Sequence, residues 1–444
     1  MCDMKLLLKL GMGTGLVVLL VLSMGHIAEA ETVTVDFAVT NGPATHRASG
    51  FLHGISTEEP DDQVVRPLKP RLFRLHASAA LTPSLYRRLA DYGATVQSVI
   101  SDSYGYPGPS GLWPGDGGDW SRWEQLVEEL VREGDSKGLQ LQWDIWNEPD
   151  SYNFWKRKDG QFFETWKRAV RTIRRVNPKA IIVGPSLSNG PCHYLYGFLL
   201  SAHAENVLPD IISWHDMDDP DHPNNVMIVR QFMAKHGIPD RPISINEFKY
   251  SSGTDHPGPT VWWLSHIEEE APESAAYSCW PDEGYSNCET HTLDGLLSRD
   301  GSRRAVWFAH KGYAEITGQL VNVEISGSRI ARIAGIAGID ADLQTGRLLL
   351  GRRENLQSSS EESVELVFRN VDRLSSSLKE RAVFVRAERI PDSGMLDSPL
   401  VTIAAAYPVV NNEVRVRLPD FGVGDAYTVV LGRVADRVPA TVPH

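Results

Sequence analysis

Two glutamates stand where the chain could bring a pair of carboxyl groups together. Glu148 ends an apolar run within QWDIWNEPD (142–150), and Glu247 lies in ISINEF (243–248), 99 residues later. Two neighbouring carboxyl groups can divide an acid–base task, because one can hold a proton while the other stays ionised as a nucleophile. Whether these two groups meet depends on the elements that carry them.

Short apolar runs alternate with longer amphipathic segments between residue 50 and about residue 316. Helical periodicity is clearest in residues 120–138, where Asp119 is a candidate N-cap and Gly138 ends the pattern. Eight apolar runs read as strands: 51–56, 71–76, 95–100, 139–146, 180–185, 210–215, 242–248 and 275–280. Eight strands alternating with helices over this length predict a (β/α)8 TIM barrel at residues 50–318.

A doubly wound open sheet is the main alternative to the barrel. No glycine-rich phosphate turn follows the first strand, and ionisable residues stand at the ends of many strands. A barrel collects its strand ends around one mouth, so this dispersal favours the barrel.

Beyond residue 318 the pattern changes from helical periodicity to strict alternation. In EVRVRLP (413–419), Val414, Val416 and Leu418 share one face, whereas charged residues take the other. This is the pattern of half-buried antiparallel strands. We therefore expect a C-terminal antiparallel β-sandwich at residues 319–444, with the strand within residues 31–49 as a candidate to complete it.

The first thirty residues read as a cleaved signal peptide. Lys5 and Lys9 precede the apolar run LVVLLVLSMG, and the segment closes on Ala28-Glu29-Ala30. We expect a mature chain that starts near Glu31 and is secreted or periplasmic. An uncleaved membrane anchor is the alternative, although the apolar run is short for a bilayer span.

The net charge of −13 argues against two classes of partner. An acidic chain without basic runs is poorly suited to bind nucleic acid or an anionic membrane. Neither the cysteine spacing nor DMDDPDHP (216–223) matches a metal-ligand pattern, so no metal and no cofactor are expected. The sequence does not indicate an oligomeric state.

Export would permit disulfides. Loss of Cys2 leaves three cysteines, so at most one pair can form. Cys279 and Cys288 are close enough to close one loop and leave Cys192 free, and three reduced, buried thiols are the alternative.

The predicted barrel places the two glutamates opposite one another. Glu148 follows the fourth strand and Glu247 ends the seventh, so three βα units of about 33 residues separate them. Both carboxyl groups then lie at the same height on facing walls. Retaining glycoside hydrolysis needs such a pair about 5 Å apart.

With WNEP after strand four and a glutamate in ISINEF at strand seven, the chain resembles the retaining glycoside hydrolases of clan A. Within that clan it is most similar to family 39, the β-xylosidase and α-L-iduronidase family, whose members also add a β-sandwich. The resemblance covers most of the mature chain, but only these two motifs are specific. The substrate it implies is a polysaccharide or an oligosaccharide.

The family pattern implies that Glu148 is the acid/base and Glu247 the nucleophile. Such a division requires the pKa of Glu148 to rise, while a nearby cation keeps Glu247 ionised. Arg74, at the end of strand two, matches the clan's arginine beside the nucleophile. An ion pair with Asp144 inside the barrel is the alternative role for Arg74.

Five further residues at the strand ends are candidates for binding the sugar. Asn147 could contact a 2-hydroxyl group, and Trp280 could stack on a pyranose ring. His215 occupies the place where many clan A enzymes have a Tyr or His that contacts the nucleophile. His53 and His76 could each bind a hydroxyl group, or pack behind the residues that do.

The long loop after strand three carries aromatic residues among glycines and prolines. Trp113 and Tyr104 could stack on glycan rings there, or they could pin the loop to the barrel. Taken together, the sequence predicts a secreted retaining glycosidase. A transglycosidase with the same site and an inactive glycan-binding barrel are the alternatives.

Overall fold

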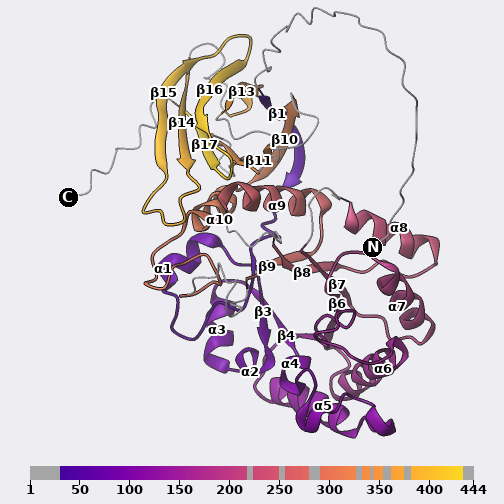
Figure 1. Ribbon diagram of the computed structural model, residues 1–444. Coiled ribbons are helices and arrows are strands. Elements are labelled where there is room, and N and C mark those ends of the chain that lie inside the picture. Colours follow the sequence, from indigo (N-terminus) through magenta and orange to yellow (C-terminus); the bar gives the residue numbers. More distant parts are fainter. Residues whose placement is uncertain are drawn as a thin grey trace, which may run out of the picture.

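The computed structural model describes residues 31–217, 224–249, 256–279, 291–326, 333–340, 344–353, 362–374 and 382–433. Eight parallel strands close into a barrel, as predicted (Figure 1). They are β2 (Gly50–Leu52), β3 (Leu72–His76), β4 (Thr95–Val99), β5 (Gln142–Asp144), β6 (Ile181–Leu187), β7 (Ile211–Asp216), β8 (Ile243–Phe248) and β9 (Ser274–Tyr277). Each overlaps one of the eight predicted apolar runs.

Helices lie between and outside these strands, as the alternating pattern predicts (Figure 1). The longer ones are α3 (Pro83–Asp91), α5 (Ser121–Ser136), α6 (Asp159–Val176), α7 (His193–Ala204), α8 (Asn225–Lys235), α9 (Pro257–Glu270) and α10 (Ala305–Glu315). Single turns form α1 (Asp62–Val65), α2 (Ala77–Ala80) and α4 (Ser101–Tyr104).

The boundaries of α5 follow from its flanking residues. The N-cap is Trp120 and not Asp119 as predicted, but the Asp119 side chain still accepts a hydrogen bond of 2.8 Å from the Ser121 backbone amide, one of the amides that the helix itself leaves unpaired. At the other end Gly138 takes a φ of +68°, which glycine adopts without steric cost. Between them Trp123 and Val127 are buried against the barrel.

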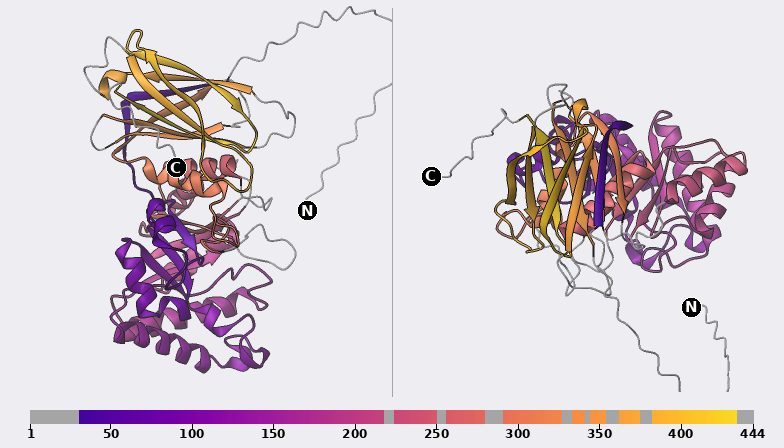
Figure 2. Two further views of the ribbon diagram at one scale, coloured as in Figure 1. Left: turned by 90° about the vertical axis from the view of Figure 1, so that its left-hand side faces the viewer. Right: turned by 90° about the horizontal axis from the view of Figure 1, so that it is seen from above.

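The other strands form one nine-stranded, mostly antiparallel sheet, separate from the barrel (Figure 2). In sheet order they are β15 (Leu400–Pro408), β14 (Ala382–Ile390), β17 (Ala426–Gly432), β12 (Gly346–Arg352), β11 (Ile333–Ile339), β10 (Gln319–Ser326), β1 (Glu31–Pro43), β13 (Glu362–Arg369) and β16 (Glu413–Phe421). The predicted alternation holds in β16, where Val414, Val416 and Leu418 are buried and Arg415 and Arg417 are exposed.

The expected sandwich is built from a single curled sheet. Its two edge strands, β15 and β16, come into contact, and the inward-facing residues form their own hydrophobic cluster. The first strand, β1, lies within the sheet, antiparallel to β10 and parallel to β13. That parallel pairing departs from the purely antiparallel arrangement we expected.

Helices α9 and α10 lie between the barrel and the sheet (Figure 1). The contact is close at Gly258, because a β-carbon there would lie 2.2 Å from the Arg352 carbonyl oxygen. The backbone amide of Gly258 donates a 2.7 Å hydrogen bond to the Gly424 carbonyl. Among the residues that the structure describes, no helix is both long and apolar enough to cross a membrane.

Candidate active site

Glu148 stands on a tight turn just beyond β5. Its φ of +45° is costly for a residue with a side chain, and such backbone strain is concentrated at functional sites. Two hydrogen bonds hold the turn: the Glu148 amide donates to the Ser186 carbonyl at 2.9 Å, and the Ser151 amide donates to the Glu148 carbonyl at 3.0 Å. The sequence places Glu148 at the end of the strand, whereas β5 ends four residues earlier, at Asp144.

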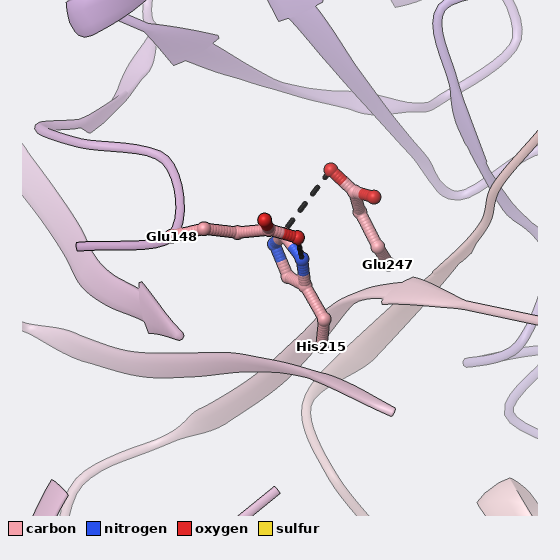
Figure 3. A group of neighbouring side chains, drawn as sticks. All are labelled: Glu148, His215 and Glu247. Carbon is pink, nitrogen blue, oxygen red and sulfur yellow. Dashed lines mark hydrogen bonds and ion pairs between the residues drawn. The ribbon is translucent and has the colours of Figure 1, made fainter. Parts of the chain in front are cut away.

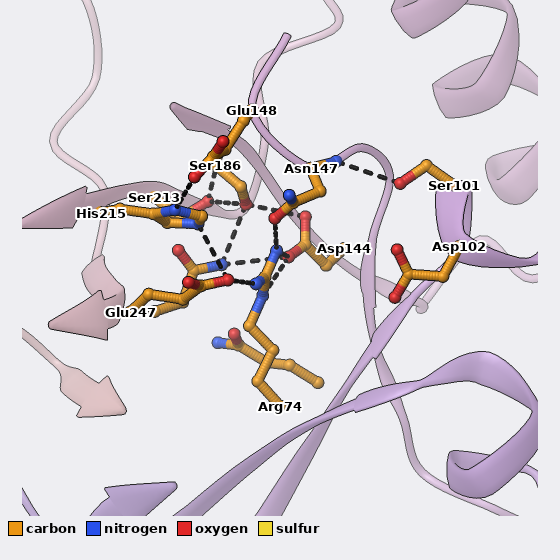
Figure 4. A network of polar contacts seen from close by, with 12 residues as sticks. Arg74, Ser101, Asp102, Asp144, Asn147, Glu148, Ser186, Ser213, His215 and Glu247 are labelled. Atoms are coloured by element: carbon orange, nitrogen blue, oxygen red, sulfur yellow. Dashed lines mark hydrogen bonds and ion pairs between the residues drawn. The ribbon is translucent and has the colours of Figure 1, made fainter. Parts of the chain in front are cut away.

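Glu247 lies near the end of β8 and is buried beside Arg74 from β3. The Arg74 guanidinium donates to Glu247 at 2.5 Å, to Asn147 at 2.9 Å and to Asp144 at 2.8 Å (Figure 4). Both roles considered for Arg74 are therefore present at once. It lies beside the predicted nucleophile, and it forms an ion pair with Asp144.

The shared guanidinium affects the pKa values of the groups around it. Burial raises the pKa of the Glu247 carboxyl, and the positive charges of His215 and Arg74 act against that rise. Burial lowers the pKa of Arg74, but the neighbouring carboxylates of Asp144 and Glu247 outweigh it and raise the pKa overall. Arg74 therefore stays charged, and its single charge serves two buried carboxyl groups.

His215, from β7, lies between the two glutamates and is fully buried. Its Nδ1 atom is 2.9 Å from Oε1 of Glu148, and its Nε2 atom is 3.6 Å from Oε1 of Glu247 (Figure 3). An oxygen of Glu148 lies within 4.8 Å of an oxygen of Glu247. Retaining glycosidases hold their carboxyl groups about 5–5.5 Å apart, whereas inverting ones need about 6.5–9.5 Å.

A polar network inside the barrel supports this pair (Figure 4). Asp144 accepts hydrogen bonds from the Ser186 hydroxyl at 2.8 Å and from the Asn246 amide at 3.0 Å, in addition to those from Arg74. The Ser186 hydroxyl also lies 2.8 Å from that of Ser213. Buried polar groups that are paired in this way hold one arrangement. The network therefore fixes the guanidinium that faces Glu247.

A second chain of hydrogen bonds runs from the surface toward the acid/base candidate. The His76 ring lies 2.6 Å from the Asp102 carboxylate, and the Tyr106 hydroxyl donates to the same carboxylate at 2.6 Å. Tyr106 also contacts the hydroxyl of Ser101, which accepts a 3.0 Å hydrogen bond from the backbone amide of Asn147. This chain fixes the backbone just before Glu148.

His53 and His76 stack on each other at the strand ends, with ring centroids 4.0 Å apart. The hydrogen bond to Asp102 raises the pKa of His76, whose side chain is 55% exposed. Burial lowers the pKa of His53 to about 3, so this ring is neutral. A role of His76 in sugar binding stays a prediction, and its exposure leaves the ring accessible.

The structure corrects the stacking role predicted for Trp113 and Tyr104. Both side chains are buried, at 3% and 6% exposure, and leave little ring surface for a sugar to stack on. Trp113 packs edge-on to Trp155 with centroids 5.2 Å apart, and Tyr104 packs edge-on to Trp123 at 5.6 Å. They pin the long loop to the barrel, which is the alternative that the sequence left open.

Three predictions fall on residues outside those that the structure describes. Trp280, Cys288 and most of DMDDPDHP lie there. Cys279 takes part in a disulfide bond, and Cys192 is free, which agrees with one pair and one unpaired thiol. The choice of Cys288 as the partner of Cys279 stays a prediction.

Some residues of the site were not found from the sequence. Asn246 precedes Glu247 as Asn147 precedes Glu148. This repeated Asn-Glu pair could have indicated that Asn246 belongs to the site. Ser186 and Ser213 left no signal, because a single serine in an apolar strand is common. Asp294 also lies near the mouth, since a β-carbon on Gly54 would come within 2.6 Å of its backbone nitrogen.

A closed (β/α)8 barrel with two glutamates at this separation defines the class of barrel glycoside hydrolases. Comparison with known proteins points to one family within this class. Residues 115–247 match the model described as glycosyl hydrolases family 39. The matched segment includes Glu148 and ends on Glu247.

Two curated relatives come from bifidobacteria. The 3-O-alpha-D-galactosyl-alpha-L-arabinofuranosidase of Bifidobacterium longum subsp. longum is 24% identical over 73% of this chain and 34% of its own length. The 3-O-beta-L-arabinopyranosyl-alpha-L-arabinofuranosidase of Bifidobacterium pseudocatenulatum is 24% identical over 78% of this chain and 42% of its own length. The chain thus spans less than half of either relative.

A solved structure from Neocallimastix frontalis matches nearly the whole fold. It has a TM-score of 0.77 and 25% identity, and the match covers 91% of this chain and 100% of that one. These matches support glycoside hydrolase family 39 as the family of this chain.

Proposed function

We propose that the chain is a secreted retaining glycosidase that works by double displacement. The observation that carries this proposal is the pair of carboxyl groups of Glu148 and Glu247, which lie within 4.8 Å of each other on opposite sides of His215. Secretion rests on the signal-peptide pattern of residues 1–30.

In the first step Glu247 attacks the anomeric carbon while Glu148 protonates the leaving oxygen. A covalent glycosyl–enzyme ester forms at Glu247, and the leaving group departs as an alcohol. In the second step Glu148, now ionised, takes a proton from water, which attacks the anomeric carbon and releases Glu247. The sugar is released with retained configuration.

The residues around the pair support this division of roles. Arg74 donates to Glu247 at 2.5 Å and opposes the rise in its pKa that burial causes, so it favours the ionised nucleophile. Glu148 is more exposed than Glu247, with side-chain exposures of 16% and 8%. The acid/base group is therefore within reach of water for the second step.

For the substrate class, we propose α-L-arabinofuranosides. Both bifidobacterial relatives are named as arabinofuranosidases that recognise a 3-O-substituted arabinose. Xylosides form the second group to screen, because a β-xylosidase of Geobacillus stearothermophilus matches 22% of the chain.

The test of the mechanism is trapping with a 2-deoxy-2-fluoro glycoside of a sugar that the enzyme hydrolyses. We expect mass spectrometry of the digested protein to find one adduct, on the peptide that contains Glu247. Glu148→Gln should slow turnover by about 10²–10⁴-fold, because it removes the proton donor. Glu129→Gln, on the exposed face of α5, is the matched control.

Two results would contradict the mechanism. Full hydrolysis by Glu247→Gln on every substrate of the wild type would exclude Glu247 as the nucleophile. An anomerically inverted first product, seen by nuclear magnetic resonance, would exclude double displacement. Product masses with added sugar acceptors also separate hydrolysis from transglycosylation on the same site.

A further inference from the structure

Tyr152 is an exposed aromatic residue that follows the acid/base candidate Glu148 by four positions. Its exposed fraction is 75%, the highest among the large apolar side chains in the described part of the chain. A single exposed aromatic ring is ordinary on a protein surface. The position of this ring is what points to a function, because Glu148 protonates the leaving oxygen in the proposed mechanism and the leaving group must therefore lie beside Glu148.

The loop that carries Tyr152 forms part of the barrel mouth. It covers residues 149–158 and ends at α6. On one side Asp150 accepts hydrogen bonds of 2.9 and 2.8 Å from the amide and the hydroxyl of Ser188, which follows β6. On the other side the Phe154 ring packs edge-on to Tyr106, which follows β4, with ring centroids 4.9 Å apart. The loop is thus held between two neighbouring segments at the carboxyl ends of the strands.

Two turns fix the backbone on either side of Tyr152. The Ser151 amide donates to the Glu148 carbonyl at 3.0 Å, and the Phe154 amide donates to the Ser151 carbonyl at 3.0 Å. The Trp146 indole also donates to the Phe154 carbonyl at 3.2 Å. The backbone that presents the ring is therefore already ordered, and a ligand that binds there does not have to be compensated for ordering it.

The same turn keeps Tyr152 near the reacting bond. A β-turn holds the Cα atoms of its first and fourth residues, here Glu148 and Ser151, within about 7 Å. Tyr152 is the next residue, so its Cα atom is at most about 11 Å from that of Glu148. A glycan whose glycosidic oxygen takes the proton from Glu148 is therefore within reach of the Tyr152 ring.

Lys156 orients the ring of Tyr152. Its ammonium nitrogen lies 4.6 Å from the ring centroid, over one face of the ring. A cation is attracted to the negative face of an aromatic ring, so this contact restricts the rotation of the side chain. The opposite face is left for a ligand. A flat aromatic face suits the apolar face of a sugar ring, and tyrosine loses little conformational entropy when it binds.

We propose that Tyr152 is the platform of the leaving-group subsite and stacks on a pyranose ring of the leaving glycan. This role rests on the proposed glycosidase function, because it is Glu148 as proton donor that places the leaving group at this loop. Tyr152 binds substrate and takes no part in proton transfer. Trp113 and Tyr104, the aromatic residues predicted for stacking, are buried, whereas Tyr152 is exposed.

The test uses two substrates that share the glycosyl group which the enzyme hydrolyses and differ in the leaving group. One is a disaccharide with galactopyranose as the leaving sugar, and the other is the glycosyl fluoride, whose leaving group has no ring. Tyr152→Ala should raise KM for the disaccharide by about tenfold and leave KM for the fluoride unchanged. A contact made equally in the ground state and the transition state changes KM and not kcat, so kcat should stay the same.

Tyr152→Phe keeps the ring and should keep the KM of the wild type for both substrates. Leu200→Ala is the matched control, because Leu200 is an apolar residue of α7 with 42% exposure. It should change neither KM. An unchanged KM for the disaccharide in Tyr152→Ala, or an equal rise in KM for both substrates, would overturn the proposal.

The platform and the glycosidase function are refuted by different results. A chain that cleaves both substrates but does not respond to Tyr152→Ala refutes the platform and leaves the glycosidase standing. A chain that cleaves no disaccharide and no glycosyl fluoride refutes the glycosidase function, and the platform with it.

Discussion

At the scale of single residues, Arg74 is the side chain on which most of the site depends. One guanidinium holds Glu247, Asn147 and Asp144, which come from two different strands and the turn beyond one of them. Arginine suits this position because its planar fork carries five donors in fixed directions and keeps its charge when buried.

Replacement of Arg74 by Gln should affect both ionisation and stability. The pKa of Glu247 should rise further, since a charge that opposes the effect of burial is lost. The nucleophile is active when ionised, so the acidic limb of the kcat/KM profile should move to higher pH. Asp144 would also lose its buried partner, at a cost of about 3–5 kcal/mol of unfolding free energy.

The measurements are a pH series of kcat/KM and urea unfolding. Arg132→Gln is the control, because Arg132 forms an exposed ion pair with Glu128 on α5. That change should leave the pH profile in place and cost under about 1 kcal/mol. An unmoved acidic limb in Arg74→Gln would show that Arg74 does not govern the ionisation of the nucleophile.

Asp294 gives a separate prediction about stability and pH. Burial raises its pKa from 3.8 to about 7, so the folded chain binds this proton more tightly than the unfolded chain does. The stability that the proton confers is complete below pH 3.8 and is lost as pH rises to about 7. Asp294→Asn cannot ionise, and it should remove this part of the decline.

Thermal unfolding of wild type and Asp294→Asn between pH 4 and pH 8 checks this directly. The variant should gain in Tm relative to the wild type as pH rises through the interval. Asp397→Asn, at an exposed position, serves as the control. Parallel curves for wild type and Asp294→Asn would contradict the raised pKa.

At the scale of elements, the strands were predictable and the contacts between them were not. The eight apolar runs matched β2–β9, because a parallel strand buried on both faces leaves a continuous apolar signature. The alternation of apolar and polar residues in β16 predicted which face is buried, because a strand that is buried on one face only has apolar residues at every second position. Such patterns are local, and a short window of sequence contains them.

The network beneath the catalytic pair could not be predicted in the same way. Asp144 meets Asn246 only because β5 and β8 take one particular register across the closed barrel. Register is set by the packing of all eight strands, so the sequence of β5 or of β8 alone does not predict it. Glu148 was placed correctly in space but assigned to the strand, since nothing local marks the turn with its positive φ.

The loop after β4 provides the prediction at this scale. Trp113 is buried among aromatic rings, so Trp113→Ala should cost about 3–5 kcal/mol of unfolding free energy. The folded fraction should keep the KM of the wild type. Leu112→Ala, at the exposed neighbouring position, should be nearly neutral in chemical denaturation. A raised KM with unchanged stability would instead restore the stacking role.

At the scale of the whole molecule, the barrel and the sheet are joined by close backbone contacts. Gly258 on α9 admits no β-carbon, because one would lie 2.2 Å from the Arg352 carbonyl oxygen and 2.7 Å from that of Asp425. Backbone atoms cannot rotate away as a flexible side chain can. The helix and the sheet must therefore separate to make room for a larger residue.

Gly258→Ala should destabilise the chain by about 1–3 kcal/mol, the usual cost of overpacking. Gly197→Ala is the control with the opposite sign, because Gly197 lies within α7 and its β-carbon would meet nothing within 4 Å. Alanine there should stabilise the helix by about 0.5–1 kcal/mol. Calorimetric scans of both variants measure the two effects, and equal shifts would contradict the proposed contact.

The place of β1 has a consequence for how the chain is made. Glu31 pairs with Val364, which is 364 − 31 = 333 residues further along. A ribosome releases β1 long before its partners in β10 and β13 exist, so this alternately apolar strand waits unpaired while the whole barrel is synthesised. An unpaired strand of this kind invites contact with other chains. Completion of the sheet is therefore a late event, and β1 is the segment most in need of protection until then.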